Sequence, residues 1–495
     1  MATPGFQDTH EKTVQRLIII TMSFASLLGA LDMSVVNISV PAIIKDLHVS
    51  VGLGTLVIIS FLLTITALIL VMGKLADRYG FRKIFLMGFL IFGLGSALCG
   101  VAPDIYFLIG SRVVQAIGAA MFASVSPAII TRYIPESALG RSLGYLIACS
   151  ALGYALGPGI GGIITSYLSW RWIFYVNLPV IAAGILLGYY FIPKDTQQKA
   201  RRPFDVRGAT LFVISLVGIL SAFSFYQVPG TPDSALILSF CIGVASGIIF
   251  LMRERKNPDP LILTELAHSR HFSLGIITCF IITALFSGVT YLMPLYLVNS
   301  RHLDQFLAGL IMMIPALVSL VAAPISGSLA DKYGSPLVSA AAIGITALGC
   351  LVIFTFNPTT VVVLIIAGVI IARVSTAAFF GPNGRLIMGH CPPEAVGTGA
   401  GMMMMVRHAG LVFGIALFQS VFAIRMYMEG IPRDGTPLVP RLTPALSVLG
   451  YQAVYLVAFC LCIAVVILSL MSKESDKEEQ RSKGNTESLK TGEYF

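Results

Sequence analysis

The chain has 495 residues, of which 56% are hydrophobic and only 12% are charged, whereas soluble domains have about 25% charged and 45–50% apolar residues. A mean hydropathy of +0.87 leaves too little polar surface to cover a soluble protein, so an ordinary cytosolic enzyme, a disordered chain and a secreted disulfide scaffold are excluded. The composition predicts an all-α polytopic membrane protein, because backbone exposed to lipid must form its hydrogen bonds internally.

The net charge of +9 reflects 33 Lys and Arg against 24 Asp and Glu residues. Such an excess is typical of the cytoplasmic loops of membrane proteins. No basic stripe with interleaved aromatic residues indicates nucleic-acid binding, so we expect no nucleic-acid partner. Seven of the eight cysteines lie in apolar runs, and their spacing matches neither a disulfide framework nor a zinc site. We therefore expect no metal and no cofactor.

Fourteen segments are candidates to cross a bilayer, since a spanning helix needs about 20 mostly apolar residues. The first segment is too long for a signal peptide, carries Asp32 and lacks a small-residue cleavage site. We place the spans at residues 17–40, 52–72, 84–101, 105–131, 141–165, 172–192, 207–227, 234–252, 272–297, 305–330, 336–356, 360–384, 397–422 and 449–471.

The distribution of Lys and Arg sets the orientation of these spans. If the N-terminal segment, residues 1–16, is cytoplasmic, 24 basic residues fall in inside segments, six in outside segments and three within spans. This asymmetry predicts that both termini are cytoplasmic and that the protein is a multi-pass protein of the plasma (inner) membrane. The tail, residues 472–495, is charged and Ser-rich and lacks periodicity, which predicts disorder.

A short sequence at the end of the second span recurs once. Gly73–Gly80 reads GKLADRYG and Gly327–Gly334, 254 residues later, reads GSLADKYG, with six of eight positions identical. Both copies end the second span of a six-span block. Parallel repeats about an axis normal to the membrane are typical of transporters, whose substrate site lies between the halves. The chain then divides into an N-terminal six-helix bundle (17–192), two inserted spans (207–252) and a C-terminal six-helix bundle (272–471).

The repeated loop has residues suited to a gate on the cytoplasmic side. Its glycines allow a tight turn between helices, and Asp77 can interact with the positive end of a neighbouring helix. Its basic residues can pair with Asp77 or with lipid headgroups. The alternative is a loop that serves membrane topology alone. The candidate gating residues are Gly73, Asp77, Arg78, Gly80, Arg82, Lys83 and Asp331.

Five motifs occur in order at matching spans: Leu31–Pro41 (LDMSVVNISVP), Gly73–Lys83, Arg112–Gly118 (RVVQAIG), Gly153–Gly162 (GYALGPGIGG) and Trp170–Pro179 (WRWIFYVNLP). On these motifs the chain resembles the major facilitator superfamily, specifically its fourteen-helix drug–proton antiporter branch. The resemblance implies two bundles that rock about a central cavity and export driven by inward proton flow. It also implies that the fifth-span motif lies between the halves, where small residues permit close helix contact and a proline bends the helix. Its residues are Gly153, Gly157, Pro158, Gly161 and Gly162.

Asp32 is the only acid well inside a span, and a charge there costs about 2.5–3.5 kcal/mol on insertion scales. The helical rise places Asp32 and Arg112 at the same depth, roughly 10–12 Å below the outer surface, so the two can pair, with Asn37 and Gln115 extending a polar network. Desolvation disfavours a carboxylate and a guanidinium favours it. A change of exposure during transport would then bind and release a proton at Asp32. The alternative is a static ion pair between helices.

Two further arginines, Arg373 and Arg407, lie inside spans of the C-terminal half, and His408 adjoins Arg407. One possibility is that these arginines extend to the membrane surface or pair with backbone carbonyls. The other is that they line the cavity and attract an anionic group. Cation exporters of the branch often carry further membrane acids, which this chain lacks in the fifth span and the C-terminal half, so cationic substrates are in doubt. Tyr291 and Phe380 complete the candidate substrate-binding residues.

The leading functional hypothesis is a monomeric proton-coupled antiporter that exports amphipathic small molecules by alternating access, as in multidrug efflux. The second is a dedicated proton-coupled transporter of an anionic or zwitterionic lipid or metabolite, and the third is a non-transporting membrane sensor. The motifs of serine hydrolases, zinc proteases and phosphate-binding loops are absent from the sequence. We therefore expect no enzymatic activity and no ATP-driven transport within this chain.

Overall fold

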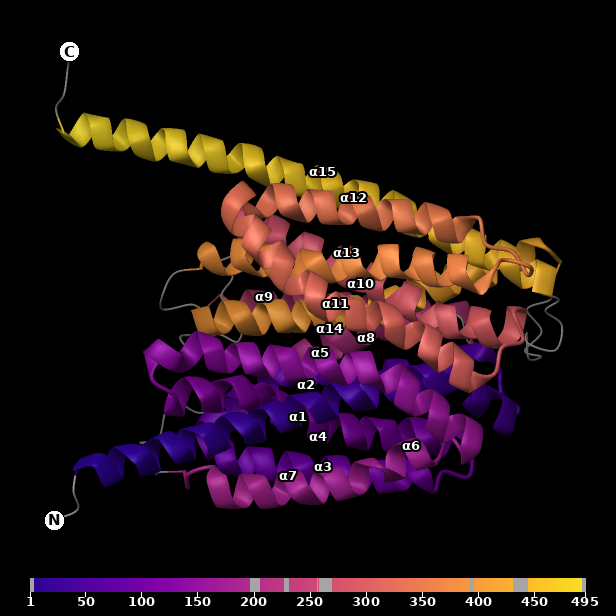
Figure 1. The fold of residues 1–495 in the computed structure, drawn as a ribbon, viewed down its shortest axis with the longest axis horizontal. Helices are drawn as coiled ribbons and strands as arrows, with labels where there is room; N and C mark the ends of the chain where they lie inside the picture. Colours follow the sequence, from indigo (N-terminus) through magenta and orange to yellow (C-terminus); the bar gives the residue numbers. More distant parts are fainter. Residues whose placement is uncertain are drawn as a thin grey trace.

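The computed structural model describes residues 4–195, 205–226, 231–255, 257, 269–391, 396–430 and 444–491. These residues form helices and loops without a strand, and fourteen helical segments among them are long and apolar enough to cross a membrane. The predicted all-α class and the predicted number of spans are confirmed. Both described chain ends lie at the same end of the molecule (Figure 1). We call this the terminal end and the opposite one the distal end.

The N-terminal half is a bundle in which polar residues start two of the spans. Ser50 caps α2 and Asp104 caps α4 by accepting backbone N–H groups of the first turn, which would otherwise have no partner. The sixth predicted span is broken at Val176, and the new helix starts with Pro179 in its first turn, where a missing N–H does no harm. The helices are α1 (Pro4–Asp46), α2 (Val51–Tyr79), α3 (Phe81–Gly100), α4 (Ile105–Tyr133), α5 (Glu136–Tyr167), α6 (Trp172–Tyr175) and α7 (Asn177–Phe191).

The C-terminal half repeats the turn between the second and third helices of the N-terminal half. Gly80 has φ +104° and Gly334 has φ +88°, a region that glycine adopts without a steric penalty. Each glycine ends one helix and begins the next, so the sequence repeat is also a repeat of backbone geometry. The helices of this half are α10 (Arg270–Leu295), the π-helix η2 (Tyr296–Ser300), α11 (Gln305–Tyr333), α12 (Ser335–Phe354), α13 (Val362–Gly389), α14 (Val396–Met428) and α15 (Pro444–Thr491).

The C-terminal tail differs from our expectation. We expected residues 472–495 to be disordered, but α15 continues as helix to Thr491 and projects beyond the bundle (Figure 1). The reason lies in composition, because Lys, Glu, Gln and Arg are good helix formers and extend a helix that is already nucleated. Residues 492–495 lie outside the described part of the chain.

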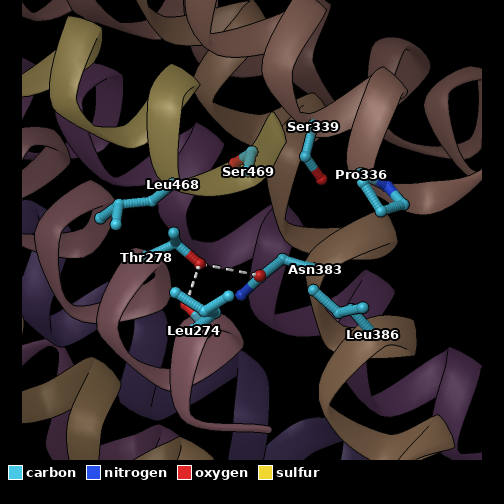
Figure 2. Close-up of a pocket in the computed structure, with 8 residues that line it drawn as sticks. All are labelled: Leu274, Thr278, Pro336, Ser339, Asn383, Leu386, Leu468 and Ser469. Carbon is cyan, nitrogen blue, oxygen red and sulfur yellow. Dashed lines mark hydrogen bonds between the residues drawn. The ribbon is translucent and has the colours of Figure 1, made fainter. Parts of the chain in front are cut away.

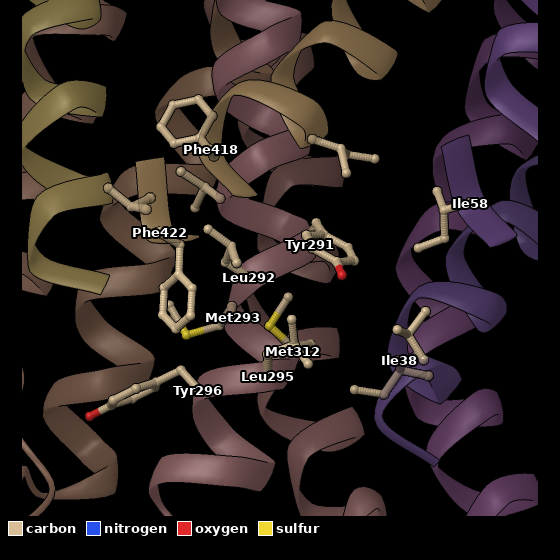
Figure 3. Packing of buried hydrophobic residues seen from close by; sticks show 14 of the residues in the cluster. Ile38, Ile58, Tyr291, Leu292, Met293, Leu295, Tyr296, Met312, Phe418 and Phe422 are labelled. Atoms are coloured by element: carbon tan, nitrogen blue, oxygen red, sulfur yellow. The ribbon is translucent and has the colours of Figure 1, made fainter. Parts of the chain in front are cut away.

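One hydrophobic core joins the two halves at the distal end. In Figure 3, Ile38 of α1 and Ile58 of α2 face Tyr291 of α10 and Met312 of α11. Toward the terminal end, the buried core of the N-terminal half is a separate cluster, and the C-terminal half has a small cluster of its own around Phe272. The buried core shared by the two halves therefore lies at the distal end, while Met405 of α14 also packs against the N-terminal cluster.

The two inserted helices, α8 (Val206–Phe225) and α9 (Asp233–Glu254), pack on α2 and α14. Phe212 and Phe250 share a small core with Val71 of α2. Phe223 of α8 contacts Phe413 of α14 with ring centroids 5.3 Å apart. Because α2 belongs to one half and α14 to the other, the inserted pair covers the seam between them.

Candidate functional site

A buried ion pair lies at the centre of the N-terminal half. Arg112 Nη1 donates to Asp32 Oδ2 at 2.8 Å, and both side chains are 1% exposed. Arg112 Nε also donates to the Val57 carbonyl at 3.3 Å, and its guanidinium lies 3.9 Å from the centroid of the Phe61 ring. The structure thus brings together the acid of α1 and the base of α4, as the depth argument predicted.

Two amides complete the hydrogen bonds of the Asp32 carboxylate. Gln115 Nε2 donates to Asp32 Oδ1 at 3.0 Å and to Ser96 Oγ at 2.8 Å, while Gln115 Oε1 accepts from Arg112 Nη1. Asn177 Nδ2 donates to the same Asp32 oxygen at 2.7 Å. The carboxylate therefore has three donors, from two residues of α4 and one of α7.

We did not predict the contact of Asn177 with Asp32 from the sequence, and we placed Asn37 in the Asp32 network, which it does not join. The break between α6 and α7 places Asn177 at the first position of α7, beside Asp32. Its sequence signals are its place in the Trp170–Pro179 motif and its polar side chain early in a span. Asn37 does not join the network, because its Nδ2 donates to the Thr290 carbonyl of α10 at 3.4 Å. It lies where the two halves meet.

The fifth-span glycines permit close contact between α5 and two helices. A Cβ at Gly153 would lie 2.6 Å from the Leu27 carbonyl oxygen of α1, and one at Gly161 would lie 2.9 Å from the Val35 carbonyl oxygen. Gly157 faces Ser34 in the same way. This side of α5 therefore lies directly on the backbone of α1.

The same motif also contacts α11 of the other half. A Cβ at Gly162 would lie 2.6 Å from the Gln305 carbonyl oxygen, and one at Gly309 would overlap the carbonyl oxygen of Pro158. The two glycine backbones meet where the halves join. We expected this motif to lie between the halves, and these contacts place it there.

The turn between α2 and α3 contacts an acid from another segment of the chain, which we did not predict from the sequence. Asp195, which follows α7, accepts from the backbone N–H groups of Arg82 and Lys83, both at 3.3 Å. A carboxylate at the start of α3 interacts favourably with the helix dipole, and a Cβ at Gly80 would overlap it. The only signal was an acid within the basic segment between the sixth and seventh predicted spans.

The other candidate gating residues lie near this turn or in its repeat. Gly73 lies in α2 near Ser124 of α4, and Asp77 and Arg78 are exposed in the last turn of α2. The Arg82 side chain donates to the Tyr189 carbonyl at 2.6 Å. Asp331 lies in α11, and its side chain is outside the described part.

The C-terminal half contains an arginine–phenylalanine cluster, formed by Arg373, Phe286, Phe380 and Arg407. The Arg373 guanidinium lies 5.0 Å from the Phe286 centroid, and that of Arg407 lies 4.8 Å from the Phe380 centroid. The two rings are in edge-to-face contact, with centroids 6.5 Å apart. His408 adjoins the cluster, and its buried Nδ1 has no hydrogen-bond partner among the described residues.

Tyr291 lies in the contact between the halves rather than in this cluster. Its hydroxyl forms a hydrogen bond with Thr55 Oγ1 of α2, and its side chain is 1% exposed. Figure 3 shows the hydroxyl directed toward the N-terminal half. Tyr291 therefore joins the distal ends of the two halves.

A small pocket lies among α10, α12, α13 and α15 (Figure 2). Its polar centre is satisfied internally, because Thr278 Oγ1 donates to Asn383 Oδ1 at 3.1 Å and Asn383 Nδ2 donates to the Gly275 carbonyl at 3.1 Å. The pocket is enclosed within the C-terminal half, away from the interface between the halves. We assign it a packing role.

This arrangement, two helical bundles with an ion pair buried inside one and a seam between them, defines a membrane transporter rather than an enzyme. A model of the Major Facilitator Superfamily matches residues 22–415. The chain belongs to this superfamily, as its motifs predicted.

Curated relatives include transporters of drugs and of a vitamin. The riboflavin transporter RibZ of Clostridioides difficile is 30% identical over 410 residues, which cover 82% of this chain and 88% of that protein. The multidrug resistance protein Stp of Mycobacterium tuberculosis is 28% identical over 412 residues, covering 83% and 76%.

A solved structure has the same fold. The bacterial homologue of the human lysosomal transporter Spinster, in an inward-facing and unoccupied conformation, aligns with a TM-score of 0.65 at 14% identity, covering 93% of this chain and 97% of that one.

Proposed function

We propose that this protein is a monomeric proton-coupled antiporter of the plasma membrane, with both termini cytoplasmic, that exports amphipathic small molecules by alternating access. The observation that carries the proposal is the convergence of three hydrogen-bond donors on the buried carboxylate of Asp32. The multidrug resistance protein Stp among the relatives supports the substrate class.

The geometry links a proton to the arrangement of helices. The ionised Asp32 of α1 holds Arg112 and Gln115 of α4 and Asn177 of α7 through charge-assisted hydrogen bonds, which are stronger than neutral ones. Protonation of the carboxyl weakens all three together. Arg112 keeps its charge throughout, so Asp32 is the group that gains and loses the proton, and α1, α4 and α7 are the elements that respond.

The proposal is tested in proteoliposomes with an imposed pH gradient and two fluorescent amphiphiles of matched size, one anionic and one cationic. We expect wild-type protein to accumulate at least one of them only when the gradient is present. Asp32→Asn, which mimics the protonated carboxyl, should lower gradient-driven accumulation at least tenfold. Gradient-driven accumulation that survives in Asp32→Asn contradicts the proposal.

Asp104→Asn is the matched control. Asp104 caps α4 from an exposed position, and asparagine is an equally good N-cap. This variant should transport at the wild-type rate, so a loss specific to Asp32→Asn is not a general effect of removing a carboxylate.

A dedicated transporter of one anionic or zwitterionic metabolite is the second candidate. Arg373 favours it, because its buried Nε and Nη1 have no hydrogen-bond partner among the described residues, as does a relative that is named for a single vitamin. Accumulation of one compound only, among several anionic amphiphiles with different scaffolds, would favour this candidate over a broad exporter.

A further inference from the structure

Each half buries one arginine on its fourth helix, and the two arginines have different surroundings. Arg112 is 1% exposed and Arg373 is 6% exposed. The Nε and Nη1 groups of Arg112 donate to Val57, Asp32 and Gln115. The Nε and Nη1 groups of Arg373 have no hydrogen-bond partner among the described residues. A buried guanidinium without an acceptor is unfavourable, and a bound ligand can supply the acceptor.

The C-terminal half has no acid of its own to pair with Arg373 at this depth. Helices α10, α12, α13 and α14 contain no Asp or Glu, and Asp331 lies in the last turn of α11. The membrane part of α15, Leu446–Met471, also lacks acids. The Phe286 ring attracts the guanidinium but offers no acceptor oxygen. Among the described residues, these helices therefore supply no carboxylate at the depth of Arg373.

Arg407 extends the site toward the N-terminal half. Its guanidinium lies on Phe380, which contacts Phe286. Met405, two residues before Arg407 on α14, packs against the core of the N-terminal half. Arg407 of the arginine–phenylalanine cluster thus lies on a helix that contacts the other half.

We propose that the exported molecule is an amphipathic anion whose carboxylate, sulfonate or phosphate group binds Arg373 and Arg407. This assignment rests on the proposed function and narrows its substrate class. Guanidinium groups match such oxyanions with paired N–H donors, and Phe286 and Phe380 supply an apolar wall for the rest of the molecule. A cation meets two like charges in this half and no carboxylate.

Equilibrium binding to the full chain in phosphatidylcholine nanodiscs tests the proposal without a proton gradient. The probes share an octyl tail: octanoate, octyl sulfonate, octyl phosphate, octanol and octyltrimethylammonium. We expect at least one of the anionic probes to bind tenfold or more tightly than both octanol and the ammonium probe. Equal or tighter binding of the uncharged or cationic probe, or no saturable binding of any anionic probe, overturns the assignment.

Competition and variants locate the site. Inorganic phosphate should not displace the bound anionic probe, because it lacks the tail; displacement at equal concentration would overturn the amphiphile assignment.

Arg373→Gln and Arg407→Gln should each weaken anionic binding at least tenfold. Arg373→Lys should recover part of the affinity, because the charge is kept. Arg425→Gln is the matched control, since Arg425 pairs with Glu429 on a partly exposed face of α14. Unchanged anion affinity in both Gln variants contradicts the proposal.

Thermal unfolding separates a binding arginine from a structural one. Arg373→Met removes a buried charge whose Nε and Nη1 groups have no partner among the described residues and should leave the melting temperature unchanged or raise it, whereas Arg112→Met breaks a buried pair and should lower it. A decrease for Arg373→Met equal to that for Arg112→Met means that Arg373 has a structural partner, which contradicts the binding role. Because these measurements need no gradient, they fail independently of the Asp32→Asn transport test.

Discussion

At Asp32, one carboxylate accepts hydrogen bonds from α4 and α7 together, so its charge is held by helices that approach it from different directions. Hydrogen bonds to an ionised group are stronger than those to a neutral one. The pH at which transport is half-maximal should therefore depend on the number of donors present, and this can be changed one residue at a time.

Asn177→Ala removes one donor and leaves Arg112 and Gln115 in place. Because the carboxylate then loses one of its three hydrogen-bond donors, we expect the half-maximal pH of gradient-driven transport to differ from the wild-type value. The measurement is the pH dependence of transport in proteoliposomes. Asn37→Ala is the control, because Asn37 bonds to Thr290 and should leave the half-maximal pH unchanged. An unshifted pH profile in Asn177→Ala would mean that the Asn177 amide takes no part in proton coupling.

Helix periodicity explains which members of this network could be predicted. Arg112 and Gln115 are three residues apart and share a face of α4. Asp32 and Asn37 are five residues apart, which is about 140° around a helix of 3.6 residues per turn, so they point in different directions. Asn177 could not be found by periodicity, because its position depends on the break between α6 and α7, which we expected to be one continuous span.

At the scale of the element, α5 and α11 touch through backbone rather than side chains. Gly162 and Gly309 meet, and the Pro158 carbonyl occupies the place of a side chain at Gly309. The motif on α5 predicted close contact, but its partner was not predicted, because Gly309 lies in an ordinary apolar run without a motif.

Gly309→Ala should push these helices apart and lower the transport rate severalfold without unfolding the protein. Its Cβ would also lie 3.2 Å from Gly162 Cα, so the nearby backbone must shift. Gly344→Ala is the matched control, because a Cβ there meets nothing within 4 Å. Transport rates in proteoliposomes compare the two, and equal rates would mean that the close contact between α5 and α11 is not needed.

The inserted pair of helices is held at the terminal end by Asp205, which caps α8 and pairs with Arg253 at 3.1 Å. Arg253 holds the pKa of the Asp205 carboxyl below its ordinary value of 3.8. Because the pKa is lowered in the folded protein, this stabilisation is present above pH 3.8 and is lost as the pH falls through the folded-state pKa.

Asp205→Ala should lower the melting temperature at pH 7 by the equivalent of about 1 kcal/mol, mainly through loss of the cap. Asp205→Asn keeps the cap and should lose less, since the ion pair is partly exposed and contributes little. Melting curves at pH 7 and pH 3 provide the test, and the difference between wild type and Asp205→Asn should shrink at pH 3. A difference that stays constant with pH would mean that the ion pair contributes nothing.

At the scale of the molecule, the halves are joined at the distal end by a common core and by the hydrogen bond between Tyr291 and Thr55. The number of spans, the repeat and the two bundles followed from hydropathy and motif order. The conformation of the transporter and the position of the inserted helices could not be predicted. A surface that faces lipid and a surface that faces another helix are both apolar, so the sequence does not distinguish the two.

A cross-link across the distal contact should stop alternation. Met313 Sδ lies 2.7 Å from the position of a Cβ at Gly159, so side chains at these two positions face each other across α5 and α11. The double variant Gly159→Cys, Met313→Cys should lose transport on oxidation and recover it on reduction. Wild type, with its eight native cysteines, treated with the same oxidant, is the control. Full transport by the cross-linked protein would exclude separation of the halves at this contact.

The place of α8 and α9 makes the two sides of the transporter unequal toward the bilayer. The seam between α2 and α14 is overlaid by an additional pair of helices, whereas α5 and α11 meet on the other side through bare glycine backbone near the distal end. The two seams therefore present different surfaces to the bilayer: the inserted pair of helices at α2 and α14, and α5 and α11 themselves on the other side.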